Sequence, residues 1–298
     1  MFKLNSLIIT PRNVNSFPAL PFRLEEDNTS RLWVMCGLLM TAFVFVLVPA
    51  QAFDPRLFEG SPIWHKPIKF ALSLAIHFFT LAILAQQISR QYRVTKTLTF
   101  FAYAGVFSAM FELIYISIQA GRGRQSHFNS ETGFEAAMYS AMGIGALFLV
   151  AVSFVLGVMI WRFSRHSLAQ TESIASNLKI GDANLGLRWG SIIGLTLGSI
   201  LTLVFAGYMS ISGSHYIGQE IGQVSTVPIV GWSRSVGDLR IPHFIATHLM
   251  QILPLIGLIS DRLNWRSKSV MIVATLVLTG FSVVSFLIAI AGQPLFGG

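Results

Sequence analysis

Seven long stretches of this sequence carry at most one charged residue each, and they constrain the fold more than any other feature. An α-helix needs roughly 20 apolar residues to cross about 30 Å of hydrocarbon. The stretches cover residues 32–52, 67–89, 98–120, 135–161, 189–210, 243–260 and 269–292. Only 11% of the 298 residues are charged, too few for the surface of a soluble domain of this size. We therefore predict an all-α polytopic membrane protein with seven transmembrane helices, whose partner is the lipid bilayer.

The distribution of lysine and arginine predicts the orientation. If the N-terminus is cytoplasmic, the inner segments carry fourteen of the 21 Lys and Arg residues and the outer segments carry seven. The positive-inside rule then favours N-in and C-out, in the inner (plasma) membrane of a bacterial cell. The expected layout is a cytoplasmic segment 1–31, a seven-helix domain 32–292 with an outer loop 211–242, and an outer tail 293–298.

The net charge of +8 comes from basic residues at the span ends, so we expect contact with lipid headgroups and no nucleic-acid partner. The single cysteine, Cys36, lies inside the first span. It allows no intrachain disulfide and no cysteine-based metal site.

The three helices predicted to run inward from the outer face all begin with a histidine beside basic residues. Their sequences are SPIWHKPIKF (61–70), GRGRQSHFNSETGFE (121–135) and GDLRIPHFIATH (237–248). Cations on this face oppose the positive-inside rule, so we expect them to serve another purpose, the attraction of an anion. The predicted substrate or anion rim consists of His65, Lys66, Lys69, Arg122, Arg124, Asn129 and Arg240.

Ionisable side chains also occur at membrane depth, where they are costly and normally face a cavity or a bundle interior. His65, Lys69, Ser73 and His77 recur every four residues and share one face of the second span. Glu112 lies about 12 Å from the outer end of the third span, at 1.5 Å per residue. We expect Glu112 and Glu135 to be catalytic or proton-carrying residues. The candidate ligands of a cofactor or metal ion are His77, His127, His243 and His248.

Three functions are compatible with a His-, Glu- and Arg-lined cavity at the outer face. The first, which we expect, is a redox membrane protein that binds haem or a divalent metal ion, because imidazoles from separate helices suit both. The second is a transporter or receptor for a small anion, and the third is a non-catalytic accessory or assembly subunit. The sequence leaves open whether the protein is an enzyme, which ligand it binds and its oligomeric state.

Three segments resemble those of an uncharacterised family of bacterial multi-pass membrane proteins. They are WHKPIKFALS (64–73), SHFNSETGFEA (126–136) and DLRIPHFIATHLMQILP (238–254). The resemblance implies a multi-pass topology and brings no activity or cofactor with it. The HxxxH pattern of seven-span zinc hydrolases is absent, since His243 and His248 are five residues apart.

Overall fold

The computed structural model describes residues 27–58, 60–164, 185–218, 225–228 and 230–297. Most of the predicted cytoplasmic segment 1–31 lies outside these residues, as do parts of the predicted outer loop 211–242. The predicted orientation in the membrane is not tested by the structure and stays a prediction.

Seven helices in the described ranges are long and apolar enough to cross a membrane. They are α1 (Asn28–Phe53), α2 (His65–Ala85), α4 (Lys96–Gly121), α5 (Gly133–Phe163), α7 (Leu185–Ser212), α8 (Arg240–Arg262) and α9 (Ser267–Ile290). Each predicted span falls on one of them, with ends that differ by a few residues. The second span was predicted to end at residue 89 but ends at Ala85. The chain turns there at Gln86 and then enters the short helix α3 (Arg90–Arg93). The all-α prediction is confirmed.

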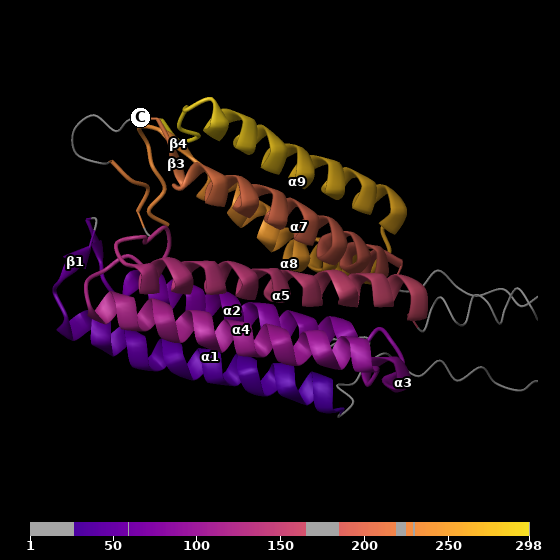
Figure 1. The fold of residues 1–298 in the computed structure, drawn as a ribbon. Helices are drawn as coiled ribbons and strands as arrows, with labels where there is room; N and C mark the ends of the chain where they lie inside the picture. The colour runs from indigo at the N-terminus through magenta and orange to yellow at the C-terminus, as the bar shows by residue number, and fades with distance from the viewer. Residues whose placement is uncertain (1–26, 59, 165–184, 219–224, 229, 298) are drawn as a thin grey trace, which may run out of the picture.

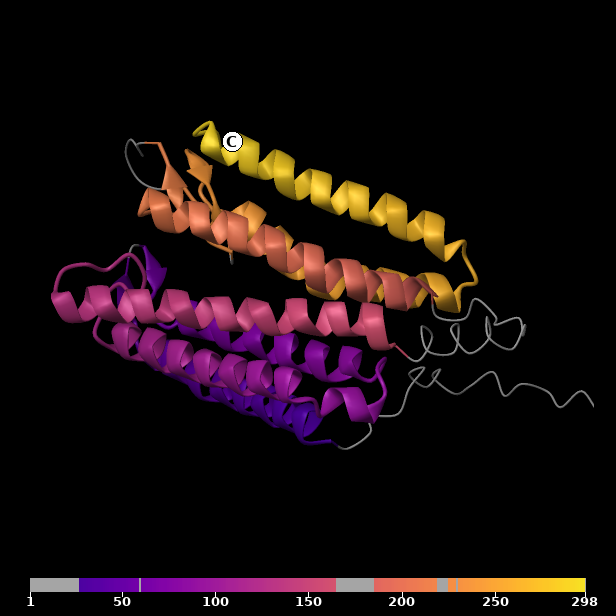
Figure 2. The same cartoon turned by 45° about the vertical axis from the view of Figure 1, so that its right-hand side comes forward.

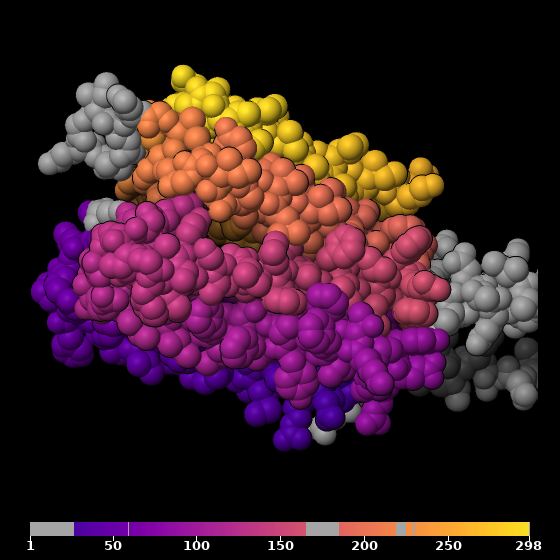
Figure 3. Space-filling view, in the orientation of Figure 1, coloured from indigo at the N-terminus to yellow at the C-terminus, as the bar shows by residue number. Residues whose placement is uncertain are grey.

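The helices form two groups that meet along α5 and α7 (Figures 1, 2 and 3). One group contains α1, α2, α4 and α5, and the other contains α7, α8 and α9. The larger hydrophobic core lies mainly in the first group, around the fully buried Trp33, Phe78 and Leu113. Large apolar side chains such as Phe107 and Leu276 remain exposed on the outside, as expected of helices whose solvent is lipid.

The backbones of α7 and α8 approach closely because α7 presents a glycine every fourth residue. These are Gly186, Gly190, Gly194 and Gly198, and Gly257 faces them from α8. A Cβ atom built on Gly194 would lie 2.5 Å from the carbonyl oxygen of Leu249, closer than any real packing contact. Small residues at four-residue spacing are the usual means of close helix packing in lipid, where apolar burial gives no driving force between helices.

Three of the described connections lie at one end of the molecule, which we call the polar end. It comprises the described residues of 54–64 between α1 and α2, residues 122–132 between α4 and α5, and the described part of 213–239 between α7 and α8. Two short antiparallel pairs lie there (Figure 1): β1 (Leu57–Phe58) with β2 (Ser61–Pro62), and β3 (Tyr216–Ile217) with β4 (Gly237–Asp238). Helices α2, α5 and α8 begin at this end, as predicted from their sequences.

The opposite end contains a buried ion pair. The Nε atom of Arg93 lies 2.7 Å from Oδ2 of Asp27, and both side chains are fully buried. Arg93 also donates to the carbonyl of Ile88 at 2.7 Å, and the Thr29 hydroxyl donates to the carbonyl of Arg93 at 3.0 Å. These bonds attach the start of α1 to the connection between α2 and α4.

Candidate functional site

His127 is the meeting point of three elements at the polar end. Its Nδ1 lies 3.2 Å from the Nζ of Lys66 on α2, and its Nε2 lies 3.5 Å from Oε1 of Glu112 on α4. The His127 ring also packs against Phe70 and against Tyr139 of α5. The Lys66 ammonium group can only donate, so the Nδ1 atom of His127 must accept its hydrogen bond. The proton of the neutral ring is therefore placed on Nε2, which faces the Glu112 carboxylate.

The environment of His127 favours the neutral imidazole. Burial lowers its pKa below the ordinary value of 6.5, and the Lys66 charge lowers it further. The Glu112 carboxylate opposes these effects, both by its hydrogen bond and by its charge. The structure thus joins two predicted site residues, Glu112 and His127, with a rim residue, Lys66.

The carboxylate of Glu135, the second predicted catalytic residue, already forms hydrogen bonds and ion pairs at the start of α5. Its Oε1 accepts a 2.6 Å bond from Arg124 and lies 3.7 Å from an Arg122 nitrogen. Its Oε2 accepts from the Thr132 hydroxyl, which in turn caps the backbone N–H of Glu135. The sequence TGFE at 132–135 has the spacing of a capping pair. These bonds explain why Glu135 is buried at this position without assigning it chemistry, and its catalytic role stays an untested prediction.

The loop between α4 and α5 is held in shape by its own side chains. Asn129 is buried, donates to the carbonyl of Gln125 at 3.0 Å and accepts from the backbone N–H of Glu131. Phe128 adopts a φ of 56°, an unusual value for a bulky residue, and its ring packs on Tyr139. Asn129, predicted to line a substrate rim, is therefore bonded to loop backbone.

At the start of α8, Arg240 is the centre of a second cluster. It forms an ion pair with Asp238, donates to the Tyr216 hydroxyl at 2.9 Å and donates to the carbonyl of Gly231 at 2.7 Å. Its guanidinium group also lies 4.9 Å from the centre of the Tyr216 ring. Sequence reasoning missed Asp238 and Tyr216. The spacing of Asp238 and Arg240 in GDLR was the available signal, whereas nothing local indicates Tyr216.

Lys69 connects the two groups of helices across the polar end. Its Nζ donates to the carbonyl of Val230 at 3.2 Å, directly before Gly231, whose carbonyl accepts from Arg240. Adjacent carbonyls are thus held by one cation from α2 and one from α8. The His215 ring adds a second connection, because it packs against Phe128 as well as Tyr216.

We expect His215 to make the protein less stable in mild acid. Burial, followed by the charge of Arg240, lowers its pKa to about 4. The unfolded chain therefore binds a proton near pH 6.5 that the folded protein accepts only near pH 4, so stability falls as the pH drops through this window. Thermal unfolding midpoints measured between pH 7.5 and pH 4.5 should show a smaller acid-induced fall in His215→Gln than in the wild type. Equal falls would contradict the expectation.

The remaining candidate histidines do not assemble around a common point. His77 lies on α2 with its ring edge-on to Phe78, and its buried Nε2 has no hydrogen-bond partner in the described part of the chain. On α8 the Nδ1 of His248 lies 2.8 Å from the carbonyl oxygen of Phe244. His243 lies five residues before His248, which places the two imidazoles about 140° apart around the helix. His65 is the first residue of α2.

Among the described residues, no group of three or more His, Cys, Asp or Glu side chains is placed to hold a metal ion. The predicted set His77, His127, His243 and His248 therefore receives no support from the geometry as a metal site. Haem ligation needs fewer protein ligands and stays a prediction.

No family model, curated protein or solved structure matches this chain.

Proposed function

We propose that the protein is a membrane receptor or transporter that binds a small anionic molecule at the polar end. The ligand is held between Lys66 and Lys69 of α2 and Arg240 of α8. The observation that carries the proposal is the convergence of Lys69 and Arg240, from separate groups of helices, on the adjacent carbonyls of Val230 and Gly231.

The present partner of Lys69 supports this assignment. A neutral peptide carbonyl binds a cation more weakly than a carboxylate or phosphate does, so an anion competes well for Lys69. Arg240 already has Asp238 as its ion-pair partner, whereas Lys69 bonds to the carbonyl of Val230.

The other basic residues of the predicted rim are less suited to bind a ligand. Arg124 pairs with both Glu131 and Glu135, and Arg122 lies near the Glu135 carboxylate. These arginines shape the loop between α4 and α5, which in turn places His127 beside Lys66. Burial and the charge of Arg240 keep His215 neutral, so its ring N–H can donate a hydrogen bond to an anion without adding charge. The N–H of neutral His127 already faces the Glu112 carboxylate.

Ligand-dependent thermal stabilisation of the detergent-purified protein tests the proposal. Small carboxylates, phosphate and sulfate are compared with neutral analogues at constant ionic strength. A ligand at 100 times its dissociation constant stabilises by about 2.7 kcal/mol and raises the unfolding midpoint. We expect at least one anion to do so, and Lys69→Gln to lose the effect.

Lys96→Gln is the matched control, because Lys96 is an exposed lysine at the first residue of α4, away from the polar end. It should respond to the anion as the wild type does. No shift with any anion, or an equal shift in Lys69→Gln, would contradict the proposal. An absorption spectrum of the same sample tests the haem prediction: a stoichiometric Soret band would favour the redox function instead.

A further inference from the structure

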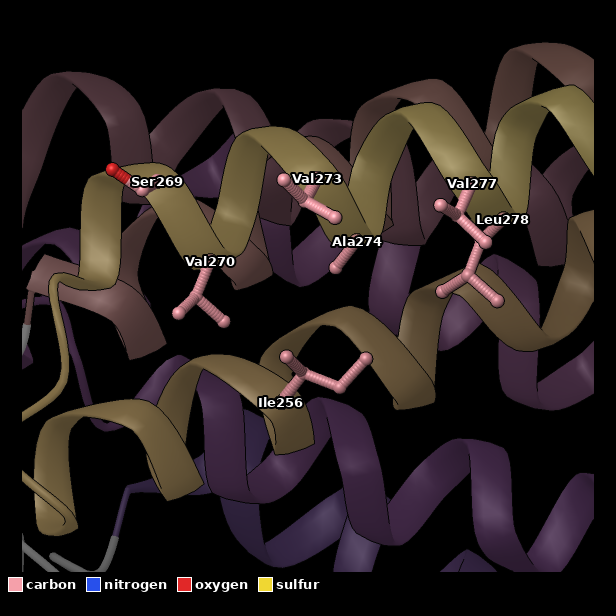
Figure 4. A pocket seen from close by; sticks show the side chains of 7 residues that line it. All are labelled: Ile256, Ser269, Val270, Val273, Ala274, Val277 and Leu278. Carbon is pink, nitrogen blue, oxygen red and sulfur yellow. The ribbon is translucent and has the colours of Figure 1, made fainter.

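An apolar groove of about 500 Å³ runs between α8 and α9, away from the polar end (Figure 4). Figure 4 shows side chains of α9 on one side and Ile256 of α8 on the other. The lining residues are Ile256, Ser269, Val270, Val273, Ala274, Val277 and Leu278. Apart from Ser269 they are aliphatic, so the groove suits a hydrocarbon chain.

The length of the groove matches one leaflet of a bilayer. From Ser269 to Leu278 the helix rises nine residues, roughly 14 Å at 1.5 Å per residue. This is about half of the roughly 30 Å hydrocarbon core. Because Ser269 lies in the first turn of α9, the groove begins at one membrane boundary and ends near the midplane.

Basic side chains are exposed at the boundary where the groove begins. The turn between α8 and α9 reads DRLNWRSK (261–268), and Arg262, Arg266 and Lys268 are all exposed. Its one acidic residue, Asp261, accepts bonds from the N–H groups of Gly186 and Leu187 and from the Ser267 hydroxyl. Trp265 is also exposed, at 55%, as is common for tryptophan at headgroup level.

We propose that this groove binds one acyl chain of an anionic phospholipid, whose phosphate is held by Arg266 and Lys268. Charge complementarity favours this occupant, because the basic turn directly precedes the groove-lining residues Ser269 and Val270. A second copy of the chain fits less well. A two-fold dimer along the membrane normal would place two such basic turns at the same depth, where they repel each other.

Native mass spectrometry of the protein after delipidation and readdition of lipid tests the proposal. Phosphatidylglycerol is compared with phosphatidylcholine of identical acyl chains, so that only the headgroup charge differs. We expect preferential retention of phosphatidylglycerol. Each basic residue near an anionic headgroup is worth about 1 kcal/mol, or about fivefold in affinity, so Arg266→Gln/Lys268→Gln should lower the preference about 25-fold.

Two further variants separate the chain-binding and headgroup contributions. Ala274→Phe fills the groove and should reduce the retention of both lipids, whereas Lys96→Gln, another exposed lysine near the start of a helix, should leave both unchanged. Equal retention of the two lipids by the wild type, or an unchanged preference in the double variant, would overturn the proposal. A lipid-free dimer that Ala274→Phe abolishes would assign the groove to a second copy and overturn it as well.

Discussion

Replacing Gly194 with leucine is expected to prevent the protein from folding. A Cβ atom at this position would lie 2.5 Å from the carbonyl oxygen of Leu249 and 3.1 Å from the ring of Pro254. The first contact is with backbone, so no rotamer change relieves it and α7 must move away from α8. Overpacking typically costs 1–3 kcal/mol when side chains can adjust. We expect a larger loss here, because these two helices make the most extensive contact among the described elements.

The matched control lies on the same helix. A Cβ atom built on Gly207 meets nothing within 4 Å, so Gly207→Leu should fold normally. The yield of monodisperse protein and the thermal unfolding midpoint in detergent measure both variants. If Gly194→Leu and Gly207→Leu gave the same yield and midpoint, the close α7–α8 contact would not be what stabilises the second group of helices.

The glycine spacing on α7 shows which features of the fold the sequence made predictable. The seven spans follow from apolar length alone, because lipid requires continuous helices whose backbone groups are all bonded internally. The stripe from Gly186 to Gly198 has a period of four in the sequence GLRWGSIIGLTLG, although it was not among the predictions. The small residues predict close packing, but the helix that they face depends on the tertiary arrangement.

The candidate site was predictable only in part, for a different reason. Cations and histidines lie at the starts of α2, α5 and α8. They cluster because all three helices begin at the same end of the molecule. The partner of each charge does not follow from this arrangement, because it depends on how the loops return. His127 reaches Glu112 only because residues 122–132 fold back over α4, and Arg240 reaches Tyr216 through the pairing of β3 with β4. Glu135 was interpreted as functional although its spacing from Thr132 already indicated a helix cap.

Breaking the buried ion pair at the opposite end should be strongly destabilising. Asp27→Ala removes the carboxylate that pairs with the fully buried Arg93 side chain, and it also removes the N-cap of α1. Removal of one partner from a buried ion pair costs about 3–5 kcal/mol. Chemical denaturation of the purified protein measures the loss as a change in the free energy of unfolding.

A double variant distinguishes the cost of an orphaned charge from the net value of the pair. Asp27→Leu/Arg93→Met removes both charges and keeps apolar volume, so it should recover the part of the lost stability that comes from the orphaned charge, whereas the helix cap of Asp27 on Ser30 is absent from both variants. Glu131→Ala is the exposed control. Glu131 pairs with Arg124 at the surface, where solvent replaces the lost interaction, and its removal should change stability little. If the double variant were no more stable than Asp27→Ala, the stabilisation at this end would come from the bonds of Asp27 to Ser30 and of the Arg93 side chain to Ile88 instead of from neutralisation of the Arg93 charge.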